Sequence, residues 1–190
     1  MKPGPSISTK IQSSPSARPS PRAEPWLRGT LTEVPAEQRA ILHALELARE
    51  DIAQWCGPLS REEFHARPYG LASVAFHLRH IAGSLDRLLT YAEGNVLSDA
   101  QLRQLAAEMN AEGSKGEILA GFERGLRASD ERVRAIDLRK WPGSRAVGRK
   151  KLPTTVAGLL IHCAEHTQRH VGQAIATAKV LLALRESPPA

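Results

Sequence analysis

Five of the seven histidines in this 190-residue chain fall into two groups whose spacing suits metal binding. His162, His166 and His170 are four residues apart, and His77 and His80 are three apart. On a helix, side chains four residues apart lie on the same side, about 6 Å apart along the axis. Two imidazoles at that spacing can bind one ion, as they do in helical zinc sites.

A third ligand would have to come from a second helix. The segment around His77 and His80 carries an apolar face that must pack in the same core, and spacing alone leaves either residue as the donor. On spacing alone, His162 also remains a candidate ligand beside His166 and His170. Without a metal, each buried ring would need hydrogen-bond partners for both nitrogens. The closer pair reads HTQRH rather than HExxH, so it lacks the built-in carboxylate base of zinc proteases.

A three-histidine site has definite chemical consequences. Neutral imidazoles leave the full charge of a divalent ion uncompensated, and at least one coordination position stays open to water or substrate. The ion can then lower the pKa of a bound water or thiol. Zn²⁺, Ni²⁺, Fe²⁺ and Mn²⁺ are all compatible with imidazole ligands.

Two polar residues share a helical face with these histidines. Gln173 follows His170 by three positions, and Ser84 follows His80 by four. One interpretation is that Gln173 orients a ring nitrogen or a substrate from just outside the metal ligands. The other is that both residues are packing or surface residues.

The segment before the last histidines is strongly basic. Residues 138–153 contain six lysines and arginines, which include Arg149 and Lys150, and no acidic residue. One interpretation is a solvated loop. The other is an anion-binding lip that attracts the carboxylates of a small thiol substrate, with Arg149 and Lys150 as the contacts.

The rest of the sequence predicts helices that would position these residues. Apolar residues recur at 3–4 spacing, and Ser60 with Glu63 and Ser114 with Glu117 form capping-box patterns. Long helices are expected at residues 35–56, 71–93, 114–136 and 154–184. No segment shows the alternation of a half-buried strand. We therefore predict an all-α protein, a four-helix bundle with long connectors.

The N-terminal residues differ in composition. Residues 1–30 are rich in Ser, Pro and basic side chains, so we expect a disordered tail there and the bundle over residues 31–186. Four basic residues against one acid give this tail, up to residue 25, half of the net charge of +6. The tail could contact nucleic acid weakly through phosphates.

Composition excludes several classes of protein. With 4% aromatic residues and two cysteines, neither a base-stacking platform nor a disulfide scaffold is expected. No apolar run approaches the ~18 residues of a membrane span. No helix-turn-helix signature is present, so specific nucleic-acid binding is not expected. These features favour a soluble cytoplasmic protein.

Two segments together resemble the DinB-like superfamily. HCAEHTQRHVGQ at residues 162–173 is similar to the last-helix motif of that family, and SVAFHLRHIAG at 73–83 is similar to its second-helix motif. The resemblance implies a four-helix bundle, usually a homodimer, with a divalent metal held by three histidines. The matching positions are His80, His166 and His170.

The resemblance also implies roles for the remaining residues. It places His77 and His162 one turn away from the ligands, next to the site rather than in it. The family often has an Arg after the last histidine, where this chain has Val171. Similar proteins are metal-dependent hydrolases and S-transferases that use a low-molecular-weight thiol, so an enzyme acting on a small molecule is expected. The alternative is a non-catalytic metal-binding or stress-response bundle.

Overall fold

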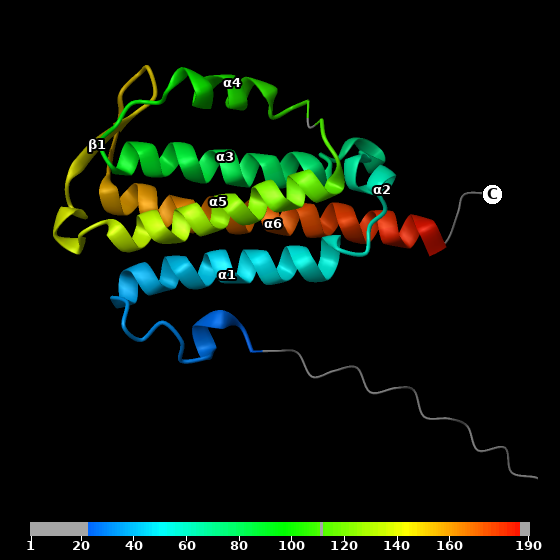
Figure 1. The fold of residues 1–190 in the computed structure, drawn as a ribbon, viewed down its shortest axis with the longest axis horizontal. Coiled ribbons are helices and arrows are strands. Elements are labelled where there is room, and N and C mark those ends of the chain that lie inside the picture. The colour runs from blue at the N-terminus through cyan, green and yellow to red at the C-terminus, as the bar shows by residue number, and fades with distance from the viewer. Residues whose placement is uncertain (1–22, 111, 187–190) are drawn as a thin grey trace, which may run out of the picture.

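The computed structural model describes residues 23–110 and 112–186, and most of these are helical. Four long helices run alongside one another (Figure 1), with α3 packed on α5 and α6, and α1 packed on the same two helices. Their bounds are α1 (Ala36–Cys56), α3 (Val74–Ala92), α5 (Lys115–Ala135) and α6 (Val156–Glu186). The predicted helical architecture is confirmed, and all four long helices lie close to where the apolar spacing put them.

Shorter elements connect the long helices. The helices are α2 (Arg61–His65) and α4 (Asp99–Ala107), with 3-10 turns η1 (Pro25–Leu27), η2 (Pro68–Gly70) and η3 (Leu138–Lys140). In Figure 1, α4 lies outside the long helices, against α3.

Side-chain caps determine where several helices begin. Capping boxes are present at Ser60 and Ser114, as predicted, and a third is present at Ser98. Ser73 accepts a hydrogen bond from the Phe76 N–H, so α3 begins three residues later than the apolar pattern suggested. Each cap satisfies a backbone N–H that the first turn leaves without a partner.

The core is built from aliphatic side chains of all four long helices. Fully buried examples are Leu42, Ile52, Leu78, Ile81, Leu85, Leu126, Leu160 and Ala178. Each buried Leu or Ile stabilises the fold by roughly 1.5–3 kcal/mol relative to an exposed position. This packing fixes the rotation of α3 and α6 about their axes, and therefore the side to which their histidines point.

The prediction of an all-α chain is wrong in one place. Strands β1 (Ser144–Val147) and β2 (Leu152–Thr155) form an antiparallel hairpin within the predicted loop. The hairpin buries little apolar surface, and its residues are exposed or half-buried. Because each of these strands has four residues, no period of two stands out in the sequence. Thr155 then accepts a hydrogen bond from the Gly158 N–H at the start of α6.

The predicted tail lies mostly outside the described residues. Its last part is described, and there η1 packs on α1 while Arg28 forms ion pairs with Glu46 and Glu50. The folded part of the chain therefore begins before residue 31. Among the described helices, none combines the length and the apolar character needed to cross a membrane.

Candidate metal centre

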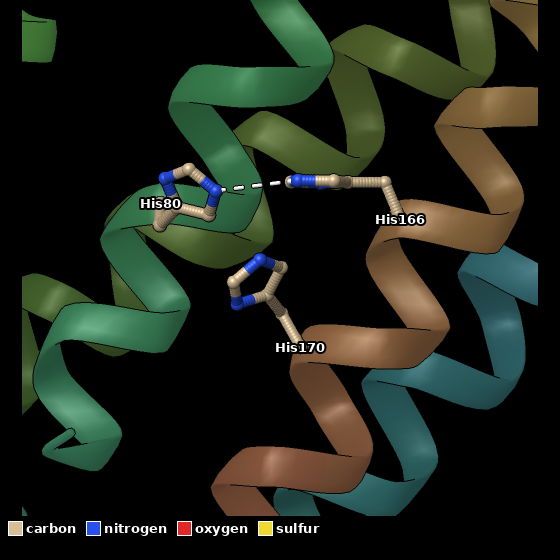
Figure 2. Close-up of side chains that lie close together, drawn as sticks. All are labelled: His80, His166 and His170. Carbon is tan, nitrogen blue, oxygen red and sulfur yellow. Dashed lines mark hydrogen bonds between the residues drawn. The ribbon is translucent and has the colours of Figure 1, made fainter. Parts of the chain in front are cut away.

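Three histidines from two helices meet between α3 and α6. His80 comes from α3, and His166 and His170 come from successive turns of α6 (Figure 2). Their ring centroids lie 5.0 Å apart for His80 and His166, and 4.4 Å apart for His80 and His170. The sequence predicted that imidazoles of two helices would converge here, and the packing of α3 on α6 brings them together.

The spacing of the ring nitrogens suits a metal ion. One ligand atom from each histidine can be chosen so that all three lie within 4.8 Å of one another. The Nε2 atoms of His80 and His166 are 3.4 Å apart. In a tetrahedral site with metal–nitrogen bonds of ~2.1 Å, ligand nitrogens lie about 3.4 Å apart. The residues present therefore fit a divalent ion that takes imidazole ligands.

Burial keeps two of these rings neutral. Loss of solvent, together with the nearby His80, lowers the pKa of His166 and of His170 to about 4. Imidazole binds a metal through a neutral nitrogen. At neutral pH both rings are therefore in the form that ligation requires.

His77 contacts the cluster from one turn below His80. Its Nδ1 lies 3.0 Å from Nδ1 of His170, and burial lowers its pKa to about 4. Between two neutral rings, one Nδ1 must donate and the other accept. If His170 donates, its Nε2 is left free to face His80.

Among the described residues, no hydrogen bond joins the other two predicted neighbours, His162 and Gln173, to the three rings, although the ring centroid of His162 lies 5.3 Å from that of His166. His162 is partly exposed, and its Nδ1 lies 3.3 Å from a carboxylate oxygen of Glu165 on the same helix. Gln173 is exposed, and none of the hydrogen bonds between described residues joins it to a histidine. Its expected orienting role stays a prediction.

The basic residues of the predicted lip are at the end of the hairpin. Arg149 and Lys150 are exposed in the turn between β1 and β2. The ten residue steps from Val156 to His166 correspond to about 15 Å of helix. The structure therefore places the two cations beyond direct contact with the three rings, and their binding of an anion stays a prediction.

Sequence reasoning missed an ion pair that contacts His80. Glu108 follows α4 and places Oε2 2.7 Å from Nδ1 of His80, while its Oε1 accepts a 2.5 Å hydrogen bond from Arg87. Glu108 is 6% exposed and Arg87 is 8% exposed. Glu108 lies 28 residues from His80 in the chain, directly after a separate short helix, so no spacing rule could connect them.

The charge of Glu108 is maintained despite its burial. Burial by itself raises the pKa of this carboxyl, but hydrogen bonds from His80 and Arg87 outweigh it and leave the pKa lowered. Arg87 also donates to Ser84 Oγ, which lies 3.3 Å from Nε2 of His80. Ser84, which the sequence placed on the face of His80, thus belongs to the same network.

Phe76 holds the ring of His80 from one side. The two rings are stacked with centroids 5.4 Å apart and an interplanar angle of 14°. Together with Glu108 at Nδ1, this contact defines both the plane and the rotation of the imidazole.

Comparison with known proteins identifies the family of the chain. A model of the DinB superfamily matches residues 44–174, which include α3 and all three clustered histidines. Searches of curated proteins and of solved structures found no significant match. The match covers more than half of the chain, and the chain belongs to the DinB superfamily.

Proposed function

We propose that this protein is a divalent-metal-dependent enzyme, either an S-transferase that uses a low-molecular-weight thiol or a hydrolase of a small molecule. The observation that carries the proposal is the convergence of His80, His166 and His170, with ligand atoms within 4.8 Å of one another. We also propose that the four long helices form the four-helix bundle expected from the family resemblance. A homodimer is proposed on the same resemblance, and a cytoplasmic location is proposed on the sequence features given above.

The ligand set determines what a bound metal could do. Zn²⁺, Ni²⁺, Fe²⁺ and Mn²⁺ all accept imidazole, and three neutral ligands leave the ion with its charge and an open position. A metal bound there supplies an acidified thiol or water as the nucleophile.

The surrounding residues have a separate task, which is to place protons. Glu108 can only accept, so Nδ1 of His80 carries the proton and Nε2 keeps the lone pair that ligation requires. His77 can accept the Nδ1 proton of His170 in the same way. Phe76 covers one face of His80 and excludes water from that side.

The two reactions can be separated by assay. The metal-free protein and protein reloaded with each of the four metals are tested with a small thiol plus an electrophile, and with ester and amide substrates without thiol. An S-transferase requires the thiol, whereas a hydrolase does not. We expect activity only in the metal-loaded protein and none in His166→Ala. Metal-loaded protein that is inactive in both assays would instead support the non-catalytic metal-binding alternative.

The basic tail is relevant to that alternative. Residues 1–22 lie outside the described residues, so the tail is tested by deletion. Weak, salt-sensitive nucleic-acid binding that disappears with residues 1–22 would assign it to the tail alone.

A further inference from the structure

We propose that Glu108 is a positioning residue for His80 and that Gly83 provides the space in which its carboxylate lies. Glu108 would hold the proton of His80 on Nδ1 and so direct Nε2 toward His166. The inference rests on the proposed metal centre, but its first test below does not require a metal.

The placement of α4 supports this role of Glu108. This helix buries none of its residues and exposes Leu102 and Leu105. Its contacts with α3 are polar: Gln101 bonds Asp86 and Thr90, and Glu108 bonds Arg87. Because α4 contributes no buried apolar side chain to the core, its clearest role is to bring Glu108 to His80.

The contact between Glu108 and His80 also determines which ring nitrogen of His80 carries the proton. An ionised carboxylate accepts hydrogen bonds and donates none. Its Oε2, 2.7 Å from Nδ1 of His80, therefore selects the tautomer with the proton on that atom. Carboxylates that accept from a metal-bound histidine orient the ring, and their loss typically weakens metal binding 10–100-fold.

The absence of a side chain at Gly83 leaves the space that the Glu108 carboxylate occupies. It lies in the middle of α3, three residues after His80, where an alanine would be the better helix former by up to about 1 kcal/mol. A Cβ atom at Gly83 would lie 2.5 Å from Oε1 of Glu108 and 2.8 Å from Nη1 of Arg87. Any side chain here would therefore displace the Glu108–Arg87 pair.

A cavity beside the Glu108–Arg87 pair has room for the displaced carboxylate. It measures about 590 Å³, lies between α3, α4 and α5, and has Gly83 and Glu108 in its lining. The three clustered histidines do not line it. Gly83→Ala should therefore move the end of a flexible side chain without disturbing the core.

Two variants and two matched controls test the proposal. Gly83→Ala displaces the carboxylate and keeps its charge, whereas Glu108→Gln keeps its shape but cannot accept from both His80 and Arg87. Gly121→Ala is the glycine control, because its Cβ would meet Arg124 only at an ordinary 3.7 Å. Glu123→Gln is the charge control, because Glu123 pairs with Arg49 away from the histidines.

The first measurement is made without metal. ¹⁵N NMR of histidine-labelled full-length protein at pH 8 reports which ring nitrogen of His80 carries the proton. We expect Nδ1–H in the wild type and both controls, and a mixture of tautomers in Gly83→Ala and Glu108→Gln. An unchanged His80 spectrum in both variants would overturn the proposal.

The second measurement is zinc affinity by competition with a chromophoric chelator. We expect Gly83→Ala and Glu108→Gln to bind zinc about 10–100-fold more weakly than the wild type, and the controls to stay within about twofold. Equal affinity in all five proteins would overturn the positioning role. If the wild type binds no zinc but the tautomer shift is seen, the metal function fails while the positioning of His80 stands.

Discussion

The Nδ1 atoms of His77 and His170 lie 3.0 Å apart, although 93 positions separate the two residues in the chain. This contact joins α3 to α6 beside the cluster. It holds the ring of His170, a candidate ligand, through a residue that is not itself one of the three. It also explains why two neutral histidines can be buried together, since each satisfies a nitrogen of the other.

Loss of His77 should weaken metal binding without unfolding the protein. His77→Phe fills the same buried space but offers no partner to Nδ1 of His170, so we expect zinc affinity to fall about 10-fold. Zinc titration of the purified variant measures this. His162→Phe serves as the control, because His162 bonds Glu165 rather than a ligand, and its affinity should match the wild type. If the two variants bound equally well, His77 would have no orienting role.

The stability of the metal-free protein should fall as the pH drops from about 6.5 to about 4. His77, His166 and His170 have pKa values lowered to about 4, chiefly by burial. In the unfolded chain their pKa is about 6.5. Between these values the unfolded state binds more protons, so lower pH favours unfolding. Thermal unfolding in a chelator across this range measures the effect. We expect the slope to decrease in His166→Gln, and an unchanged slope would contradict the assignment.

Metal should stabilise the folded protein by mass action. A ligand that binds only the folded state at 100 times its Kd adds about 2.7 kcal/mol to the free energy of unfolding. Adding zinc to the metal-free protein should therefore raise Tm, and a chelator should reverse the rise. His170→Ala should abolish the response and His162→Ala should keep it. A response of equal size in both variants would place the metal elsewhere.

Reversing the charge of the hairpin turn should affect substrate capture but not metal binding. Arg149→Glu with Lys150→Glu is expected to raise KM for an anionic thiol at low salt, while kcat and zinc affinity stay constant. The effect should vanish near 0.15 M salt, because the Debye length of ~8 Å is then shorter than the separation from the cluster. A KM that is unchanged at low salt would remove the anion-binding role.

Two glycines of α5 should respond oppositely to alanine. A Cβ at Gly125 would lie 2.8 Å from Cβ of Ala82 on α3, whereas one at Gly121 meets no atom closer than 3.7 Å. We expect Gly125→Ala to destabilise the protein by roughly 1–3 kcal/mol through overpacking. Gly121→Ala should be neutral or stabilising. Urea denaturation compares them, and similar values for both would contradict the close approach of α3 and α5.

The sequence predicted the parts of the fold that leave a periodic or local signal. Apolar residues at 3–4 spacing located the long helices, and Ser60 and Ser114 marked two helix starts. The hairpin was missed because its strands bury too little to impose a pattern. Spacing predicted that His166 and His170 share one helix face, whereas the choice of His80 as the third member came from the family resemblance.

Glu108 shows the limit of such reasoning. Its importance depends on how a short helix crosses α3 and on the missing side chain at Gly83, and neither has a signature in the sequence. The pattern reveals ligands that repeat along a helix. It does not reveal an isolated residue, such as Glu108, that tertiary packing places beside those ligands.

The most direct test of the metal centre is elemental analysis of the protein purified without a His tag, beside His166→Ala purified in the same way. We expect close to one divalent metal ion per chain in the wild type and almost none in the variant. No bound metal in the wild type after incubation with Zn²⁺, Ni²⁺, Fe²⁺ or Mn²⁺, or equal metal in both proteins, would contradict it.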